Sequence, residues 1–346
     1  MEKISIFMPV YNGAEFLRRS IGSVLNQTYS NWELFCVDDC STDDSYNIIC
    51  SLSGKDGRIK PIRKEVNGGS VPKSWNYIIN KLDGDFVQYL TQDDLLAPDY
   101  FEKQIKCYHE TGADWIVARY STYDYTTESA KIDAIKGGYD RLGNTINGNM
   151  AFILSIDWSI SGFGLTKRSL YDGVLWDEKY YNSDDLVCKT MFHKCNKVAF
   201  GPGIYYRGNN PKAITSAPKP FRLHMMATEF EILRIIRDDY KMSEAVAQWQ
   251  ICHMVSMFRL MRAFIKKYAG TWTIDEASMA KSVFNDSVKR LFNDEAICLL
   301  FKSNVSFYRL YVKIKADQLG NPAYLKGFVY KLRTFLFLCC LRRKLF

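Results

Sequence analysis

The sequence predicts an α/β protein with a doubly wound parallel sheet, followed by a helical C-terminal region. Apolar runs of strand length alternate with amphipathic runs of helix length over residues 1–216. This alternation is typical of a parallel sheet that carries helices on both faces. From residue 217 onward the apolar residues recur at helical spacing, and Gly and Pro become rare. We therefore expect two domains, 1–216 and 217–346, joined at a proline-punctuated segment over residues 215–220.

The individual elements follow from the apolar runs in chain order. The helix after the first strand is predicted because Phe16, Ile21 and Val24 lie on one face. The helix after the second strand has Ser41 or Thr42 as a candidate N-cap. The expected strands are Ile4–Met8, Glu33–Val37, Ile59–Arg63, Phe86–Leu90 and Lys197–Phe200. The expected helices are Glu15–Asn26, Asp43–Leu52, Ser74–Leu82, Leu95–Tyr108, Leu186–His193, Leu223–Tyr240, Ser243–Tyr268 and Ile274–Leu300.

Charge is distributed unevenly between the two predicted domains. Residues 217–346 contain 22 Lys+Arg and 11 Asp+Glu, a net charge of +11, whereas residues 1–216 contain 24 and 27, a net charge of −3. Near the end, basic residues flank the apolar block Phe335–Leu341, which is far shorter than the roughly 20 residues of a membrane-spanning helix. The basic region fits an anionic membrane surface, a contact with a second copy, or a helical cap with a basic exposed face. Nucleic-acid binding is disfavoured because the first domain is acidic.

Several classes of protein lose support from what the sequence lacks. The ten cysteines form no C-x-x-C pair, which argues against a disulfide scaffold and a structural zinc site. The N-terminal apolar run is too short for a signal peptide, so we expect a cytoplasmic protein, at most peripheral on the inner membrane. The glycine motifs of P-loop kinases, Rossmann dehydrogenases and α/β-hydrolases are absent.

Acidic or polar segments follow three of the predicted strands. They are Pro-Val-Tyr-Asn at 9–12, Asp-Asp-Cys-Ser at 38–41 and Gln-Asp-Asp at 92–94, and a further Asp pair stands at 184–185. The carboxyl ends of parallel strands converge on the crevice where open α/β sheets bind ligands. Paired carboxylates there suit a hard divalent cation together with a phosphate-bearing substrate. These residues therefore favour an enzyme that uses a nucleotide-activated substrate.

The same motifs, in this order and spacing, resemble the nucleotide-binding half of family 2 glycosyltransferases. The resemblance also includes Asn-Gly-Gly-Ser at 67–70 and Gly-Asp-Phe-Val at 84–87, and it covers about residues 3–210. It implies a GT-A fold and a nucleoside-diphosphate-sugar donor, with UDP preferred. It also implies a setting in bacterial surface polysaccharide synthesis, such as O-antigen or capsule, where the acceptor is a glycan or polyprenyl-linked glycan.

The resemblance assigns roles in binding the nucleotide sugar to nine residues. Asp39 is expected to read the base, because a carboxylate can accept the N3–H of uracil, which cytosine lacks. The family usually has Gly where this chain has Cys40, so the local turn is expected to differ slightly. Lys73 replaces an Arg and offers a point charge without the bidentate fork. The nine residues are Pro9, Tyr11, Asn12, Asp38, Asp39, Asn67, Lys73, Asp93 and Arg207.

The remaining assignments concern the metal, the base and the sugar surface. By resemblance Asp94 coordinates Mn²⁺ or Mg²⁺, although Gln92 stands where a further acid is usual. Of the pair Asp184 and Asp185, the second is expected to be the catalytic base; ordinary capping of a helix N-terminus is the alternative. Trp158 and Trp176 are expected on the acceptor and donor-sugar surface, with a buried structural Trp as the alternative for either one.

The sequence thus predicts an inverting, metal-dependent glycosyltransferase. Two other classes stay open at this point. A nucleotidyltransferase also joins an α/β sheet to metal-binding acids, but residues 12–15 are too short and acidic for its Gly-rich basic phosphate loop. A non-catalytic sugar-nucleotide-binding protein with the same fold would retain the nucleotide residues without using the base.

Overall fold

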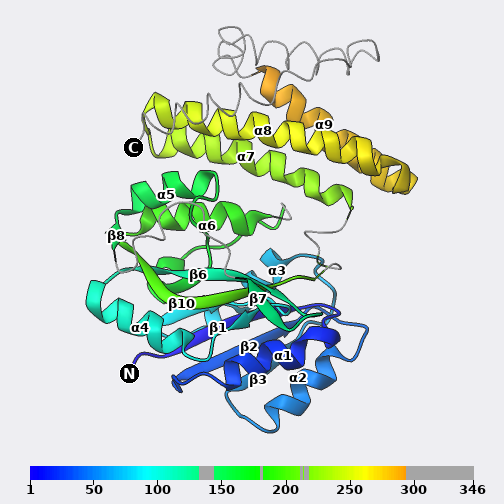
Figure 1. Cartoon of the computed structure of the whole chain (residues 1–346). Coiled ribbons are helices and arrows are strands. Elements are labelled where there is room, and N and C mark those ends of the chain that lie inside the picture. The colour runs from blue at the N-terminus through cyan, green and yellow to red at the C-terminus, as the bar shows by residue number, and fades with distance from the viewer. Residues whose placement is uncertain (132–143, 180–181, 211–212, 214–217, 294–346) are drawn as a thin grey trace. The chain divides into compact units, whose positions relative to one another are not determined.

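A computed structural model describes residues 1–131, 144–179, 182–210, 213 and 218–293 of the chain (Figure 1). The chain divides into two compact units, Met1–Ala217 and Pro218–Phe346. All predicted nucleotide, metal and base residues belong to the first unit. The predicted basic segment around Phe335–Leu341 lies outside the described residues.

The described part of the first unit contains one mixed sheet of ten strands. Eight strands follow the order β3-β2-β1-β4-β9-β6-β10-β5, while β7 pairs with β6 and β8 with β10. The strands are β1 (Ile4–Val10), β2 (Trp32–Asp38), β3 (Ile59–Arg63), β4 (Phe86–Tyr89), β5 (Leu95–Leu96), β6 (Trp115–Asp124), β7 (Ser129–Lys131), β8 (Thr145–Ile146), β9 (Gly164–Lys167) and β10 (Val198–Gly208). The helices of this unit are α1 (Ala14–Leu25), α2 (Ser45–Ser53), α3 (Val71–Ile78), α4 (Tyr100–Thr111), α5 (Gly148–Ile156) and α6 (Ser183–Lys194), with short 3₁₀ turns η1 (Ile79–Lys81) and η3 (Arg168–Tyr171).

Helices cover both faces of the sheet, because alternate residues of the strands point to opposite sides (Figure 1). On one face Ile6 and Met8 of β1 join a core with α1, α2 and α4. On the other face Phe7 joins a core with α3, α5 and α6, in which Trp75 and Phe192 are fully buried. The sheet is therefore buried on both faces, and its strand ends are what remains available for a site.

The sheet is not parallel throughout, as the strand–helix alternation had predicted. β1, β2, β3 and β4 are mutually parallel, but β9 runs antiparallel to both β4 and β6, and β5 runs antiparallel to β10. Antiparallel neighbours need no crossover helix. The two-residue β5 and the four-residue β9 therefore left no alternation in the sequence that would have predicted them.

Several predicted helices begin at another residue, among them α3, which begins at Val71, three residues before the predicted Ser74. Leu95 and Leu96 form β5 against β10, and α4 begins only at Tyr100, because Pro98 disfavours helix in the residue before it. Helix α6 begins at Ser183, three residues earlier than predicted. The Asp184–Asp185 pair consequently lies inside the first turn of α6 and does not precede the helix.

The described part of the second unit is helical. It contains η4 (Pro220–His224), α7 (Met225–Arg234), the π-helical turn η5 (Ile235–Asp239), α8 (Glu244–Tyr268), η6 (Ala269–Thr271) and α9 (Ile274–Asn293). Buried Glu229 of α7 accepts a hydrogen bond from Gln250 of α8 and lies 3.3 Å from His253. Over the residues described, no helix combines the length and apolar character needed to cross a bilayer.

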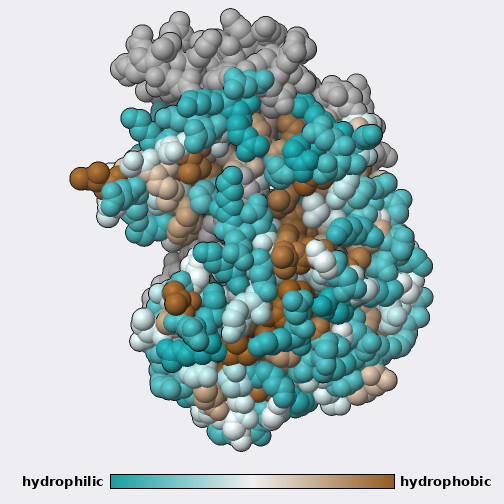
Figure 2. All heavy atoms as spheres, turned by 180° about the vertical axis from the view of Figure 1, so that it is seen from behind, coloured by the Kyte–Doolittle hydropathy of each residue, from teal (hydrophilic) through white to brown (hydrophobic). Residues whose placement is uncertain are grey.

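The surface of the first unit is mainly polar (Figure 2), as expected when the apolar side chains are buried in the two cores. In the view of Figure 2 the first unit presents mainly hydrophilic residues, with hydrophobic residues gathered in places between them. Large apolar side chains that stand exposed in this unit include Tyr11, Trp158 and Leu175. Of these, Tyr11 and Trp158 were predicted to contact substrate, so their exposure is relevant to the site.

Candidate active site

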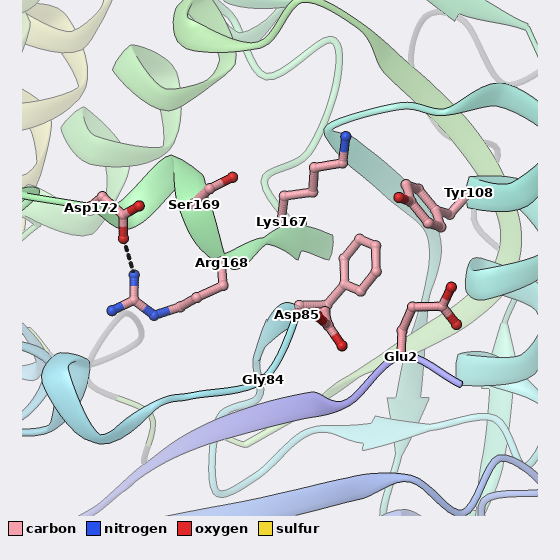
Figure 3. A pocket seen from close by; sticks show the side chains of 9 residues that line it. Glu2, Gly84, Asp85, Tyr108, Lys167, Arg168, Ser169 and Asp172 are labelled. Atoms are coloured by element: carbon pink, nitrogen blue, oxygen red, sulfur yellow. Dashed lines mark hydrogen bonds and ion pairs between the residues drawn. The ribbon is translucent and has the colours of Figure 1, made fainter.

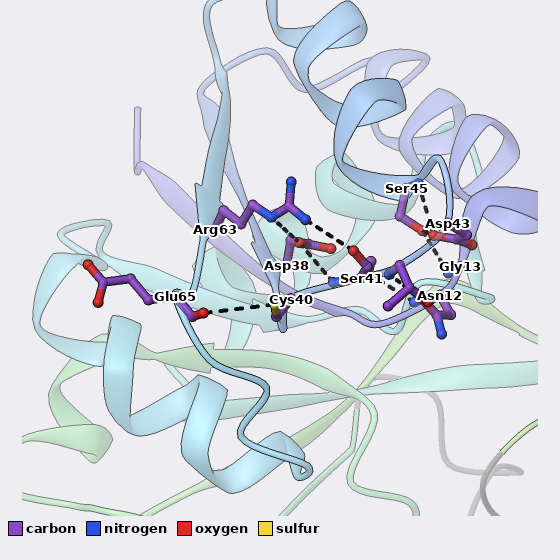
Figure 4. Close-up of polar contacts among 10 residues, drawn as sticks. Asn12, Gly13, Asp38, Cys40, Ser41, Asp43, Ser45, Arg63 and Glu65 are labelled. Carbon is purple, nitrogen blue, oxygen red and sulfur yellow. Dashed lines mark hydrogen bonds and ion pairs between the residues drawn. The ribbon is translucent and has the colours of Figure 1, made fainter.

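The ends of the first two strands are joined by hydrogen bonds into one polar turn (Figure 4). The amide of Asp39 donates to the carbonyl of Val10 at 2.7 Å. The amide of Asn12 donates to Ser41 Oγ at 3.0 Å, and the Asn12 Oδ1 accepts from the amide of Thr42 at 2.9 Å. The predicted segments 9–12 and 38–41 are thus neighbours, and Tyr11 projects from them with 44% of its surface exposed.

Both turns contain a residue in the left-handed region of backbone space. Asn12 has φ 49° and Cys40 has φ 62°. Asn tolerates this conformation, whereas a Cys pays the steric penalty of its Cβ. Cys40 therefore stands in a conformation that favours Gly, and the expected difference from the family's turn stays a prediction.

Asp39 is held by a loop that follows β3. Its Oδ1 accepts from Lys64 Nζ at 2.5 Å and from the amide of Gly68 at 2.8 Å, and its Oδ2 accepts from the amide of Gly69 at 2.9 Å. Gly69 has φ 73°, a conformation that a side chain would strain. The carboxylate is only 6% exposed, so a base that bonds to it must share or replace these donors.

Asp38 lies deeper than its neighbour. It is fully buried, its Oδ2 accepts from the amide of Ser41 at 3.2 Å, and Arg63 Nε lies 3.5 Å from the same oxygen. Its Oδ1 has no hydrogen-bond partner among the described residues. Arg63 also donates to the carbonyl of Ser41, so Arg63 and Asp38 together hold the backbone of the turn at Ser41. The geometry gives Asp38 a supporting position and leaves Asp39 nearer the surface.

The third acidic segment is tied to the first turn through Gln92. The Gln92 Oε1 accepts from the amide of Tyr11 at 2.9 Å, and its Nε2 donates to the Tyr11 carbonyl at 3.1 Å. An acid at this position would lack the donor. The side chain that departs from the family pattern therefore joins the two loops, a role that the sequence analysis did not assign to it.

Asp94 points into the protein. Its Oδ2 accepts from Tyr205 Oη at 2.6 Å and its Oδ1 from the amide of Gly208 at 2.8 Å, both on β10. The residue is 5% exposed. Burial, and next the negative charge of Asp93, raise the pKa of Asp94 to about 6. Asp94 therefore fastens the end of β10 to the loop that follows β4.

Asp93 points the other way and is half-buried. Its Oδ2 accepts from Asn210 Nδ2 at 2.8 Å, while its carbonyl accepts from Tyr125 Oη at 2.6 Å. Of the two neighbouring carboxylates it is the one that solvent reaches. The sequence could not separate the two, because both follow the same strand and only β10, more than a hundred residues away, distinguishes them.

The described residues were compared with what a divalent cation requires. They contain no group of three or more His, Cys, Asp or Glu side chains that could hold a metal ion. Asp94 is buried, and both of its oxygens accept hydrogen bonds inside the protein, so less of this carboxylate than of Asp93 is open to a cation. A single accessible carboxylate, as at Asp93, fits a cation held mostly by diphosphate oxygens. Asp93 is therefore a second candidate for the metal ligand, and the role of Asp94 stays a prediction.

The two acids of α6 open onto an aromatic pocket of about 150 Å³. Asp184 and Asp185 line it together with Trp158 and Trp176, the residues predicted for the sugar surface. The full lining consists of Tyr89, Trp115, Trp158, Gly162, Phe163, Gly164, Thr166, Tyr171, Trp176, Asp184, Asp185, Val187, Cys188 and Met191. Carboxylates beside aromatic faces are suited to a polar ligand that also has apolar surface, such as a sugar.

The two tryptophans contribute differently. Trp176 is 6% exposed, stacks on Trp75 with centroids 4.7 Å apart, and exchanges backbone hydrogen bonds with the amide side chain of Asn76. Trp158 is 47% exposed and has φ 59°, a strained conformation for a bulky residue. Trp176 is thus part of the packed wall, and Trp158 is the indole that a ligand can reach.

The pocket is connected to the acidic loop through two aromatic rings. Phe163 lines the pocket and stacks on Tyr205 with centroids 4.4 Å apart, and Tyr205 is the residue that donates to Asp94. Tyr89, which also lines the pocket, is the last residue of β4 before the loop that carries Asp93. The acids Asp184 and Asp185 of α6 and the loop at 91–94 therefore border the same region of the first unit.

The two acids in α6 have different surroundings. Burial, and next the charge of Asp185, raise the pKa of Asp184 to about 6. Asp185 forms an ion pair with Lys189, one helical turn later. Burial also raises the pKa values of Cys188 and Tyr171 in the same pocket. Lys189 was not among the predicted residues, although its i+4 spacing from Asp185 is a signal the sequence contains.

Three predicted nucleotide residues stand at the edges of the site. Asn67, Lys73 and Arg207 are all exposed. Asn67 belongs to the loop whose glycines hold Asp39, and Arg207 lies on β10 next to Gly208. Pro9 is half-buried within β1 and pairs in register with Val37. These positions are compatible with the roles that the resemblance implied, which stay predictions.

A larger cavity lies at the opposite edge of the sheet, where β4 begins (Figure 3). It has a volume of about 430 Å³ and is lined by residues of both charges, among them Asp85, Lys167 and Arg168. Figure 3 shows Arg168 pointing toward Asp172, with which it pairs at 2.9 Å, while Lys167 pairs with Asp114. Arg168 and Lys167 are thus paired with acids of the protein itself, so we do not take this cavity as the candidate active site.

Comparisons with known proteins agree with the geometry. The sequence model described as "Glycosyl transferase family 2" matches residues 5–172. The chain is similar to glycosyltransferase GlyG of Streptococcus pneumoniae, at 31% identity over 213 residues covering 58% of this chain and 68% of that protein. It is similar to poly(ribitol-phosphate) beta-N-acetylglucosaminyltransferase TarP of Staphylococcus aureus, at 31% identity over 176 residues covering 50% and 51%. Among solved structures, S. aureus TarS 1–349 in complex with UDP-GlcNAc has a TM-score of 0.63 at 18% identity and covers 92% of each chain.

The extent of these matches varies. The chain spans between 14% and 68% of the length of the curated relatives compared with it. The likeness to TarS, at 18% identity, concerns the fold, and it confirms the predicted GT-A architecture with a helical C-terminal region.

Proposed function

The chain belongs to glycosyl transferase family 2, and on that premise we propose that it is an inverting glycosyltransferase that moves a sugar from a nucleoside diphosphate to a hydroxyl group of a glycan or lipid-linked glycan. The observation that supports this best is the aromatic pocket bordered by Asp184 and Asp185, which adjoins the loop of Asp93. A catalytic base and a diphosphate-binding carboxylate are the two parts that a direct displacement at an anomeric carbon needs.

The proposed donor is a UDP-sugar. Tyr11 supplies an exposed ring, and the residue before it, Val10, accepts a backbone hydrogen bond from Asp39, whose carboxylate can accept the N3–H of uracil. In binding, the base would take the place of one of the two glycine amides that now donate to Asp39. The solved TarS complex contains UDP-GlcNAc, and TarP is named as an N-acetylglucosaminyltransferase, which favours that donor for a first assay.

For the cation we propose Asp93 as the protein ligand. Mn²⁺ or Mg²⁺ held by this carboxylate and the diphosphate would stabilise the charge of the departing nucleoside diphosphate. Asn210, which donates to Asp93 Oδ2, would orient the carboxylate. Asp94 would act indirectly, since it fixes the loop to β10 through Tyr205 and Gly208.

For the base we propose Asp185. The pKa of Asp184 is raised, so this acid holds its proton more readily, whereas Asp185 is paired with the ammonium group of Lys189. The carboxylate would accept the acceptor hydroxyl proton as the oxygen bonds to the anomeric carbon and the bond to the diphosphate breaks. An α-linked donor would then give a β-linked product. The exposed indole of Trp158 is the proposed acceptor platform.

The proposed setting is the synthesis of a bacterial surface polysaccharide on the cytoplasmic face of the membrane. Two relatives are named for bacterial polymers, TarP for poly(ribitol-phosphate) and TuaG for teichuronic acid. Residues 217–346 carry a net charge of +11, which favours an anionic surface. Co-sedimentation of the full chain with vesicles tests the membrane part. Binding to anionic but not to neutral vesicles supports it, and equal behaviour with both contradicts it.

Donor choice is tested by thermal stabilisation with a panel of nucleotide sugars, with and without Mn²⁺. A ligand at a hundredfold excess over its dissociation constant stabilises the folded state by about 2.7 kcal/mol. UDP-sugars are expected to shift the unfolding temperature more than CDP- or GDP-sugars, and Mn²⁺ to increase the shift. The absence of a shift with every donor would contradict the proposal.

Catalysis is tested separately with Asp185→Asn. The variant is expected to keep donor binding and to lose at least about 100-fold in transfer, since a general base contributes about 10² to 10⁴. Asp184→Asn is the matched comparison and is expected to lose less. A wild-type protein that binds UDP-sugars but transfers to no acceptor would support a non-catalytic binding protein instead.

A further inference from the structure

A lysine is buried beside the proposed base. Lys189 lies four residues after Asp185 on α6, its side chain is 1% exposed, and its ammonium group pairs with Asp185 Oδ1. The same ammonium lies 4.2 Å from the centre of the Trp158 ring. It is therefore enclosed between the carboxylate and the face of the indole, and little of it meets water.

Burial of this lysine is not explained by stability. Removing an ammonium and a carboxylate from water costs several kcal/mol each, which their mutual attraction seldom exceeds. Apart from Ser183, the other buried side chains of α6 are apolar, namely Val187, Met191 and Phe192. A Met at position 189 would fill similar space without this cost. The cation is thus better accounted for by what it does to Asp185.

The titratable groups that line the pocket with Asp185 oppose its ionisation, although its place in the first turn of α6 favours it. Asp184 and Cys188 on α6, Tyr89 on β4 and Tyr171 on η3 line the pocket with it. None of these groups is cationic, and Asp184 is a second acid whose pKa burial has raised. Burial and a neighbouring carboxylate both favour a protonated acid, which cannot accept a proton from the acceptor.

We propose that Lys189 is a positioning residue for Asp185: it keeps the carboxylate ionised and fixes its orientation toward the pocket. Trp158 completes the arrangement. One face of its indole encloses the ammonium and shields it from water, while the rest of this half-exposed ring is available to the acceptor sugar. Trp158 has a strained backbone, with φ 59°, in the arrangement that places its ring over Lys189. The inference rests on the proposed function, in which Asp185 is the base.

The first test is the pH dependence of kcat/KM for UDP-sugar transfer by the full chain. An opposite charge within about 4–6 Å shifts a carboxyl pKa by about 1–3 units. Lys189→Met is therefore expected to move the acid limb of the profile upward by at least about one pH unit, with much of the activity recovered at high pH. Lys189→Arg, which keeps the charge, is expected to restore the limb toward its original position. Lys194→Met, on the exposed side of α6, is the matched control and is expected to leave the limb unchanged.

A second variant covers the case in which Lys189→Met does not fold. Trp158→Leu removes the indole over the ammonium and, lying at an exposed position, leaves the core intact. Water and salt then weaken the ion pair, so the acid limb is expected to move upward by a smaller amount that grows with ionic strength. An acid limb that stays in place in every folded variant overturns the inference, whatever happens to kcat.

A transfer-independent measurement separates this inference from the proposed function. In Lys189→Met the buried acid should hold its proton to higher pH than in the unfolded chain, so stability to urea should fall as the pH rises from about 5 to 8. The double variant Asp185→Asn, Lys189→Met has no carboxyl at position 185 and should keep only the smaller fall that Asp94 and Asp184, with pKa values raised to about 6, contribute. The same slope in both variants would overturn the role of Lys189, whereas a wild-type protein without transfer activity would contradict only the proposed function.

Discussion

At the scale of single residues, backbone conformation identifies Cys40 as a strained position. A non-glycine residue in the left-handed region costs about 1–2 kcal/mol, and the Cys40 thiol has only a weak contact, 3.9 Å from the Glu65 carbonyl. The turn nevertheless carries the carboxylate that is proposed to read the base. Its conformation is imposed by hydrogen bonds between the turns and not by the residue itself.

We therefore predict that Cys40→Gly stabilises the protein by about 0.5–1 kcal/mol, because Gly adopts this conformation without strain. Urea unfolding measures the change. Cys50→Gly, within helix α2, is the control and should destabilise by about 0.5–1 kcal/mol. A destabilised Cys40→Gly variant would show that the thiol contributes more than its position costs.

Substitution of Asp93 and of Asp94 should have different effects, the first on metal-dependent binding and the second on stability. Asp93→Asn is predicted to remove most of the Mn²⁺-dependent increase in UDP affinity, with stability changed by less than about 0.5 kcal/mol. Asp94→Asn replaces one accepting oxygen by an NH₂ group, which removes the acceptor of either Gly208 or Tyr205, and is predicted to cost about 1–3 kcal/mol of stability. Calorimetric titration with UDP and Mn²⁺ measures the first effect. Loss of metal dependence in Asp94→Asn alone would return the metal role to Asp94.

Asp94 also gives a pH prediction. Its pKa is raised to about 6, so between about pH 4 and 6 the folded protein holds a proton that the unfolded chain has released. The stability that this group contributes is complete below pH 4 and is lost as the pH rises through 6. Asp94→Asn cannot titrate, so its urea stability should fall less over this range. An equal fall in both proteins would place the titrating group elsewhere, Asp184 being the first candidate.

At the scale of elements, the end of β10 sets the geometry of the acidic loop. A Cβ on Gly208 would lie 1.9 Å from the Asp93 carbonyl oxygen, so strand and loop can approach this closely only because position 208 has no side chain. Tyr205 and Gly208, both in β10, supply the two hydrogen bonds to Asp94. A shift of β10 would therefore also displace the loop at 91–94.

Gly208→Ala should force the strand and the loop apart. We predict a loss of about 1–3 kcal/mol in stability and weaker Mn²⁺-dependent binding of UDP. Gly22→Ala in α1 is the control, because a Cβ there meets nothing within 4 Å, and it should be neutral or stabilising by up to about 1 kcal/mol. A Gly208→Ala variant with unchanged stability and binding would mean that the loop adjusts without the strand.

At the scale of the whole molecule, the chain consists of two compact units with different compositions. The first carries the sheet and every residue assigned to the nucleotide, the cation and the base. The described part of the second is helical, and residues 217–346 carry the excess of positive charge. Chains with separate compact units commonly unfold in more than one step.

We predict two transitions in calorimetry of the full chain. UDP with Mn²⁺ should stabilise the first unit by about 2.7 kcal/mol at a hundredfold excess over the dissociation constant, which raises its unfolding temperature. The unfolding temperature of the second unit should not change. Scans with and without ligand measure this. A single transition that moves as a whole would indicate that the two units unfold as one.

The sequence was enough to predict the family, the parallel direction of the first four strands and the set of acids that follow them. These follow from local patterns, since apolar runs specify strands and the residues after them lie at the carboxyl edge. The surroundings of each acid became visible only in the folded chain. Asp94 is buried because Tyr205, 111 positions away, bonds to it, and Lys189 is enclosed because Trp158 comes over it from another element. Burial and charge pairing depend on segments that the chain brings together only on folding, and they decide the chemistry of a carboxylate.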